Sequence, residues 1–276
     1  MGLELPEILN LSRQMEKTLK NKIISEIVLG ERSKSLIKQG MCSLDEKGDE
    51  ILNSPIKSVK SRGKWIFIGF KNEMFLVLGE LIGKFRYLED EKDFPDSYHV
   101  LFQFTDGSAL SFQSSLYAFL LAADKEEIHD HKYAGNIGPS PVDEEFTYSY
   151  FCDILSKYNN RGIKGVLNLQ GELSGLGNAY INDILYKARI HPKAKVSSLK
   201  DSEKKELYDV IIETVNTAIN KRGSIKEYDL FGETGNYVRL VDKPVKNMKC
   251  TICGVQMVKM NVMGSSSYVC PQCQRM

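Results

Sequence analysis

The chain lacks long apolar runs, and cysteine and tryptophan are scarce in it. None of its apolar stretches approaches the length of about 18 residues that a membrane-spanning helix needs, so no membrane association is expected. No apolar signal segment stands at its start, and two of its six cysteines, Cys42 and Cys152, stand alone. A secreted disulfide framework is therefore not expected. With 42% hydrophobic and 26% charged residues and no internal repeat, the composition predicts a globular protein. The use of reduced cysteines indicates the cytoplasm.

Charge is nearly balanced over the whole chain but divided between its halves. The formal net charge is +1, yet residues 151–276 hold 19 Lys and Arg against 12 Asp and Glu, or +7. The remaining 18 basic and 24 acidic residues give residues 1–150 a charge of −6. A basic C-terminal half is the expected footprint of phosphate binding, although an ordinary solvated surface gives the same count. Charge therefore permits a nucleic-acid partner without requiring one.

The other four cysteines are grouped near the C-terminus as two C-x-x-C pairs with 16 residues between them. Each pair places two sulfurs on one tight turn, and four thiolates complete a tetrahedron around Zn²⁺. Such a site is closed, so its metal folds a hairpin and does not catalyse. Disulfides or free thiols are the alternatives. The predicted zinc ligands are Cys250, Cys253, Cys270 and Cys273.

Strand-like and helix-like patterns occupy different parts of the chain. A helix is expected to begin at Pro6, and β-branched and aromatic runs from Ile23 to Phe119 predict about six to eight strands, with a hairpin turn at Asp106-Gly107. Helical periodicity returns after a polar segment that contains two prolines. We therefore predict an α+β protein of four parts. They are a β-sandwich with its leading helix at 1–128, a linker at 129–145, a helical domain at 146–240 and a zinc-finger β-hairpin at 241–276.

A glycine-rich turn lies between two stretches with helical periodicity. It reads Ser174-Gly175-Leu176-Gly177-Asn178. Two glycines let the backbone approach a ligand closely, and the N–H groups that open the next helix point outward at the positive end of its dipole. The Asn178 amide adds a donor, so the turn suits a DNA phosphate held without reading of sequence. A plain helix-hairpin turn is the alternative, because such turns often contain glycine.

Taken together, several motifs resemble the formamidopyrimidine-DNA glycosylase / endonuclease VIII family. The resemblance covers nearly the whole chain, and the order and spacing of the motifs are hard to explain by chance. The motifs are ELPE at residues 4–7, SRGK at 61–64, IGPSPVDEEF at 137–146, SGLGNAYINDILYKARIHP at 174–192, and the zinc finger that ends in CPQCQ.

The resemblance implies a two-domain clamp around double-stranded, damaged or abasic DNA. A β-sandwich with an N-terminal helix is joined to a helix–two-turn–helix domain that carries the zinc finger, and the damaged nucleotide is flipped out of the stack. In the family, the N-terminal amine, usually that of a proline, attacks the sugar C1′, the base leaves, a Schiff base forms, and elimination cuts the strand. An α-amino group suits this role because its pKa of about 8 leaves free amine near neutral pH.

The family's roles fall on specific residues of this chain. Glu4 maps to the carboxylate that handles protons, and Lys64 to the turn lysine that contacts the lesion nucleotide or its phosphate. Asn178 maps to the phosphate-binding asparagine, and Lys164 and Tyr117 are also assigned to DNA contact. Gly2 would supply the amine once Met1 is removed.

Departures from the family pattern cluster at the active-site positions. Leu3 stands where the family has its proline, and Leu78 and Leu81 replace a histidine and a void-filling methionine. No cation occupies residues 116–118, where the family has an Arg-Phe pair, and Ser265 replaces the arginine of the finger. Each well-made charge-assisted contact that is lost costs about 1.5–3 kcal/mol.

Three functions remain open on these residues. The first is a monomeric DNA N-glycosylase with AP-lyase activity in base excision repair, which uses Gly2, Glu4 and Lys64. The second is a catalytically impaired relative that binds abasic or distorted DNA without cutting it. The third is a protein whose zinc and helical parts serve an RNA or protein partner.

Overall fold

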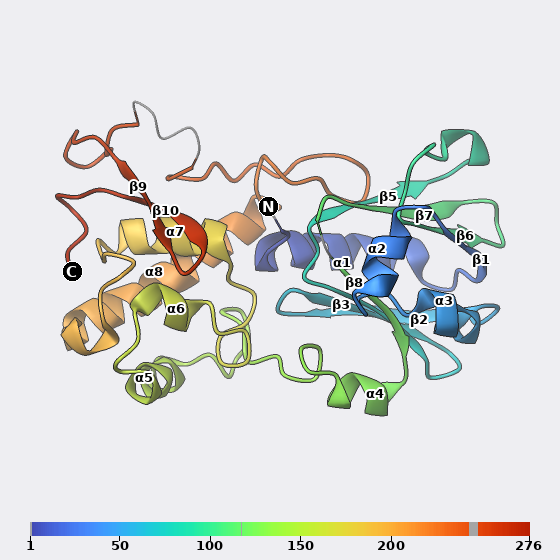
Figure 1. Ribbon diagram of the computed structural model, residues 1–276, viewed down its shortest axis with the longest axis horizontal. Coiled ribbons are helices and arrows are strands. Elements are labelled where there is room, and N and C mark those ends of the chain that lie inside the picture. Colours follow the sequence, from blue (N-terminus) through green and yellow to red (C-terminus); the bar gives the residue numbers. More distant parts are fainter. Residues whose placement is uncertain (1, 117, 243–247) are drawn as a thin grey trace. The chain divides into compact units, whose positions relative to one another are not determined.

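The β-rich half of the sequence folds as two four-stranded antiparallel sheets, ordered β1-β6-β7-β5 and β2-β3-β4-β8 (Figure 1). The structure is a computed structural model, and it describes residues 2–116, 118–242 and 248–276. Both sheets contribute to one core, through residues such as Ile68 and Phe102, so they form the predicted β-sandwich. The strands are β1 Ile24–Leu29, β2 Ile56–Arg62, β3 Trp65–Phe70, β4 Phe75–Gly79, β5 Gly83–Leu88, β6 Val100–Phe104, β7 Ala109–Ser114 and β8 Phe119–Ala123.

Helix α1, Leu5–Leu19, begins one residue before the predicted start and covers this core. Its apolar residues recur at three- and four-residue steps and are buried, while Pro6 lies in the first turn, where its missing N–H costs nothing. Ser12 Oγ lies 2.9 Å from Ser61 Oγ, which joins the helix to β2. The predicted turn at Asp106-Gly107 joins β6 to β7, and Gly107 has the left-handed φ of +86° that this turn requires. Shorter helices complete this part: α2 Ser33–Lys38, α3 Leu44–Lys47, η1 Gly48–Ile51, η2 Glu91–Asp93 and α4 Lys125–Asp130.

The chain divides into two compact units, and residues 221–236 lie in the first. The first unit consists of residues 1–136 and 221–236, and the second of residues 137–220 and 237–276. From the sequence, the segment 221–236 was predicted to belong to the helical domain at 146–240. It is instead fixed to the sandwich, because the Tyr87 N–H donates to Leu230 O (2.9 Å) and the Leu230 N–H donates to Gln14 Oε1 (3.0 Å).

The second unit contains helices and the C-terminal hairpin. The hairpin strands pair Val262 with Ser265 across a tight turn, in which Met263 and Gly264 have φ of +54° and +76°. Among the helices that the structure describes, none has both the length and the apolar character needed to cross a membrane. The elements are α5 Tyr148–Lys157, α6 Ile163–Leu167, α7 Asn178–Lys187, η3 Val196–Ser198, α8 Asp201–Asn220, β9 Val258–Val262 and β10 Ser265–Val269.

Candidate functional site

The N-terminal residues run against the connection between β4 and β5. The Leu3 N–H donates to Leu81 O (2.8 Å), and the Leu3 side chain is buried. Gly2 lies so close that a Cβ there would stand 3.2 Å from both Leu81 O and Ile82 Cγ1. The connection 80–82 therefore fixes the path of the chain into α1 and limits the side chain that position 2 can carry.

Glu4 is the N-cap residue of α1 and is buried, with about 6% of its surface exposed. Its backbone N–H donates to Glu7 Oε2 (3.2 Å), while Glu7 Oε1 accepts from the Ser224 N–H (2.8 Å). Glu7 thus joins the start of the helix to the returning segment 221–236. Gly223 leaves room for this carboxylate, because a Cβ there would lie 2.9 Å from Glu7 Oε1. Two carboxylates, Glu4 and Glu7, are therefore held in the first turn of one helix.

Lys64 lies in the two-residue turn between β2 and β3, and its side chain is only 11% exposed. Its Nζ lies 3.7 Å from Glu80 Oε2. Glu80 directly precedes Leu81, and its φ of +46° is uncommon for a residue other than glycine. The N-terminal segment and Lys64 thus meet the same connection, one through Leu81 and the other through Glu80. Glu80 was not among the site residues predicted from the sequence, although a single acid within the apolar run LVLGELIG is a visible signal.

In the second unit, the side chain of Gln170 fixes the glycine-rich turn. Its Oε1 accepts from the Gly175 N–H (3.0 Å), and its Nε2 donates to Leu176 O (2.8 Å). Ser174 Oγ and Asn178 Oδ1 are buried and have no hydrogen-bond partner among the described residues. Such atoms are rare and call for a water or a ligand. Rotation of the Asn178 amide would present its N–H₂ donor at the same place, at the start of α7.

Lys164, assigned to DNA contact from the sequence, is buried beneath the C-terminal hairpin, with 4% of its surface exposed. Its Nζ donates to Ser267 Oγ (2.7 Å), Ser265 Oγ (2.8 Å) and Val262 O (3.5 Å), so all three ammonium donors have acceptors. Burial lowers the pKa of Lys164 to about 8. Here Lys164 fastens α6 to the hairpin. Tyr117, also assigned to DNA contact, lies outside the described residues.

The four C-terminal cysteines come together as the spacing predicts. Their sulfurs all lie within 4.8 Å of one another, with Cys253 Sγ 3.4 Å from Cys270 Sγ and Cys250 Sγ 3.9 Å from Cys273 Sγ. Four thiolates at about 2.3 Å from a tetrahedral Zn²⁺ would be about 3.8 Å apart, so the donor set and its size fit that ion. No cysteine is in a disulfide.

A hydroxyl group of α7 supports the cysteine cluster from outside. Tyr186 Oη lies 3.2 Å from Cys250 Sγ and accepts from the Thr251 N–H (3.0 Å). Burial by itself would raise the pKa of the Cys250 thiol, but this hydrogen bond and the nearby backbone N–H groups outweigh it and hold the pKa at about 6. The hydrogen bond with Cys253 instead raises the pKa of the Cys273 thiol to about 12, so a metal ion would have to displace that proton on binding.

Comparisons with known proteins give a consistent result over both units. The family model described as the formamidopyrimidine-DNA glycosylase N-terminal domain matches residues 3–115, and the formamidopyrimidine-DNA glycosylase H2TH domain matches residues 137–229. A formamidopyrimidine-DNA glycosylase from Bacillus cereus is 30% identical over 275 residues, which are 98% of each chain. One from Streptococcus pneumoniae is 30% identical over 281 residues, which cover 99% of this chain and 98% of the relative.

Solved structures of the same kind of protein share the fold. Lactococcus lactis Fpg in a complex with abasic-site-containing DNA superposes with a TM-score of 0.83 and 25% identity, covering 99% of this chain and 100% of that one. The same coverage and identity, with a TM-score of 0.86, are found for the LlFpg protein in a complex with a THF-DNA and an inhibitor.

Proposed function

The chain belongs to the formamidopyrimidine-DNA glycosylase family, and we propose that it binds damaged double-stranded DNA and acts in base excision repair as a DNA glycosylase and AP lyase. The contacts that support the catalytic role all lie in the first unit. The N-terminal segment contacts Leu81 and Lys64 contacts Glu80, both in the connection 80–82, and the Glu4 and Glu7 carboxylates lie in the adjoining helix turn.

The proposed reaction uses the α-amine of Gly2 after removal of Met1. The amine nitrogen bonds to C1′ of the flipped nucleotide as the C1′–base bond breaks and the departing base takes up a proton. Opening of the sugar ring leaves a protonated imine. Loss of a proton from C2′ then lets the bond to the 3′ oxygen break. Glu4 would transfer protons and Lys64 would hold a phosphate of the lesion strand.

The second unit is proposed to hold the DNA backbone. The Ser174 hydroxyl and, after rotation of its amide, the Asn178 N–H₂ can donate to a phosphate at the start of α7, since Ser174 Oγ and Asn178 Oδ1 have no partner among the described residues. Zn²⁺ on the four cysteines would keep the hairpin folded and has no open coordination position for catalysis. Thiols that must stay reduced to bind the metal are consistent with a cytoplasmic protein, and we expect a monomer.

Borohydride trapping on a duplex with one abasic site tests this function. We expect a covalent adduct that maps to Gly2, and Glu4→Gln should lower its yield by about 10²-fold or more, since the substitution removes the proton-transfer group. Glu46→Gln, at an exposed acid of α3, is the control and should trap like the wild type. Tight binding of the duplex without any adduct would replace the enzyme with a protein that recognises damage and does not cut.

A further inference from the structure

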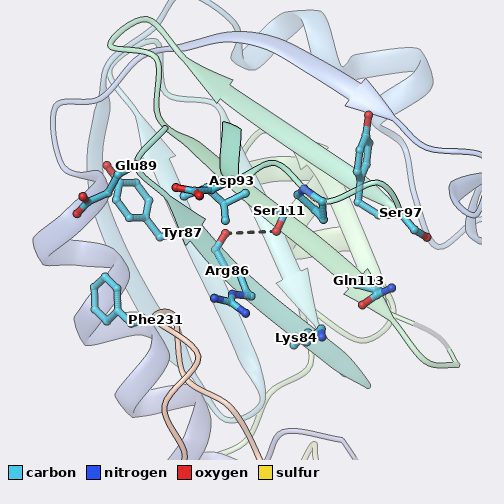
Figure 2. Close-up of a pocket in the computed structure, with 12 residues that line it drawn as sticks. Lys84, Arg86, Tyr87, Glu89, Asp93, Ser97, Ser111, Gln113 and Phe231 are labelled. Atoms are coloured by element: carbon cyan, nitrogen blue, oxygen red, sulfur yellow. Dashed lines mark hydrogen bonds between the residues drawn. The ribbon is translucent and has the colours of Figure 1, made fainter. Parts of the chain in front are cut away.

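A cavity in the first unit, of about 580 Å³, lies over β5 and β7 (Figure 2). Its floor is the face of the sheet that points away from the core. Phe85 and Phe112 are buried between the sheets, so their neighbours Lys84, Arg86 and Gln113 project to the opposite side. The cavity is therefore separate from Glu4 and Lys64 and is not used in the proposed reaction.

Four polar side chains of β5 and β7 lie side by side on this face: Lys84, Arg86, Ser111 and Gln113. The strand register places Lys84 opposite Gln113 and Arg86 opposite Ser111, and Ser111 Oγ donates to Arg86 O (3.4 Å; Figure 2). Side chains two residues apart on one strand stand about 7 Å apart, so the two cations can reach one small anion together. Gln113 and Ser111 add hydrogen-bonding groups that suit neutral or anionic oxygen atoms.

The two cations have no ionic partner. Within the described part of the chain, neither Lys84 nor Arg86 has a carboxylate oxygen within 4 Å. Other lysines of the same unit are paired, among them Lys57 with Glu73 (3.0 Å). Two acids, Glu89 and Asp93, also line the cavity (Figure 2), but their carboxylates lie more than 4 Å from both cations. Two adjacent cations that face a cavity without an ion-pair partner favour an anionic ligand.

An aromatic ring stands beside the cations. Phe231, in the returning segment, lines the cavity and is 49% exposed. Its neighbour Gly232 has a φ of +85° and leaves space for the Arg86 guanidinium, because a Cβ there would lie 3.3 Å from Arg86 Cζ. The segment is fixed by the backbone bond between Tyr87 and Leu230. A fixed, half-exposed ring next to a guanidinium is suited to stacking on a planar, electron-rich group.

The hollow continues past Lys84. An adjoining cavity of about 430 Å³ shares Lys84 and Gln113 and adds Arg32 and the half-exposed Tyr228. Adjoining hollows lined by cations and exposed aromatic rings are typical of surfaces that bind unpaired nucleic-acid strands.

From these contacts, we propose that the cavity over β5 and β7 binds a nucleotide, with its phosphate on Lys84 and Arg86 and its base against Phe231. The bound nucleotide is either free in solution or an unpaired nucleotide of a DNA strand, since both present the same phosphate and base. The volume is ample for one such unit. The proposal does not depend on catalysis at Gly2.

Calorimetric titration of the full-length, zinc-loaded protein with deoxyadenosine monophosphate, and separately with a hexamer of unpaired deoxyadenosines, tests it. We expect the wild type to bind at least one probe with a Kd of about 1 mM or lower at low salt. Lys84→Gln combined with Arg86→Gln should weaken that binding at least about tenfold, and Phe231→Ala should weaken it about tenfold by removing the stacking surface. All three residues face solvent or the cavity, so these variants should fold.

The controls separate this site from general charge effects. Lys34→Gln combined with Lys38→Gln removes the same charge from the exposed side of α2 and should bind like the wild type. Inorganic phosphate should bind at least about tenfold more weakly than the nucleotide, because it offers no base. Binding of neither probe at about 10 mM would overturn the proposal, as would full affinity in the double variant. Since the readout is binding, loss of trapping at Gly2 leaves this test intact.

Discussion

The Glu80 carboxylate lies 3.7 Å from Lys64 Nζ, and Lys64 is the cation that we propose to hold a phosphate of the lesion strand. A phosphate that approaches Lys64 meets a cation already paired and must also approach a negative carboxylate. Glu80→Gln should therefore raise the affinity for an abasic duplex about two- to fivefold and steepen its dependence on salt. Fluorescence anisotropy over a range of salt concentrations measures both quantities.

Glu73→Gln is the matched control for this prediction. Glu73 also has a left-handed φ, of +66°, and also pairs with lysine, through Lys57 (3.0 Å), but it lies in the exposed β3–β4 turn. Its substitution should leave the affinity unchanged. An equal gain in both variants would show that net charge, and not release of Lys64, sets the affinity.

Lys164 predicts an unusual dependence of stability on pH. Its pKa falls from an ordinary 10.5 to about 8 on burial in the folded state. Between these pH values the unfolded chain holds more protons than the folded one, so the stability that this residue contributes rises with pH. Below pH 8 burial of the charged ammonium costs the fold on the order of 3 kcal/mol, and this cost is relieved as the pH rises toward 10.5.

Urea unfolding of the wild type and Lys164→Met at pH 7 and pH 10 isolates this contribution. The free energy of unfolding of the wild type, relative to the variant, should increase by about 2 to 3 kcal/mol between the two pH values. Lys193→Met replaces an exposed lysine of the same unit and should give no such change. If the free energy of unfolding of the wild type relative to Lys164→Met is the same at pH 7 and pH 10, the Lys164 ammonium stays charged beneath the hairpin.

At the scale of elements, the first turn of helix α7 carries the proposed phosphate contact through Asn178. Asn178→Ala should weaken binding to an abasic duplex about tenfold, because it removes a hydrogen bond to a charged group. Asn168→Ala alters an exposed asparagine in the same unit, at the end of α6, and should bind like the wild type. Anisotropy titrations at one salt concentration compare them. Equal affinities in the two variants would leave the turn with a purely structural role.

Further along α7, Tyr186 contacts the cysteine cluster. Groups that hydrogen-bond to metal ligands usually change metal affinity 10- to 100-fold when removed, and we expect a loss of about that size for Tyr186→Phe. Competition with a chromogenic chelator measures it. Tyr208→Phe is the control, since it removes a hydroxyl that donates to Phe146 O and not to a cysteine. Unchanged zinc affinity in Tyr186→Phe would show that the four thiolates alone set the binding.

Elements that rest on local signals could be predicted from the sequence. Pro6 placed the start of α1 to within one residue, Asp106-Gly107 placed a hairpin, and the cysteine spacing placed the metal-ligand cluster. Partners that rest on distant contacts could not. Lys164 is 101 residues from Ser265, so its sequence neighbourhood could not show that its ammonium would be buried under the hairpin.

The division of the whole molecule into these two units could not be predicted from the sequence for the same reason. Residues 221–236 follow a long helix of the second unit, and glycines such as Gly223 show where the helix ends but not which unit the segment joins. The segment lies in the first unit. The contacts that hold it there, from Glu7 and Gln14, span 217 and 216 residues. They join this segment to helix α1, which lies far away in the sequence.

Because each unit has its own core, zinc removal should affect only part of the molecule. The cluster of buried residues around Cys250 and Cys270 includes Tyr186, Met257 and Tyr268 and belongs to the second unit. A closed four-cysteine site contributes its metal-binding energy to the folding of its hairpin. Chelation should therefore unfold the hairpin and weaken binding to an abasic duplex.

The fluorescence of Trp65 shows whether the first unit stays folded when zinc is removed, because Trp65 is the one tryptophan of the chain and is buried in that unit. Its fluorescence maximum should stay the same when a chelator removes the metal, while far-UV circular dichroism and the melting temperature of the second unit change. Re-addition of Zn²⁺ should restore DNA binding. A shift of the Trp65 emission on chelation alone would contradict the independence of the two cores, and the hairpin would then be required for the sandwich as well.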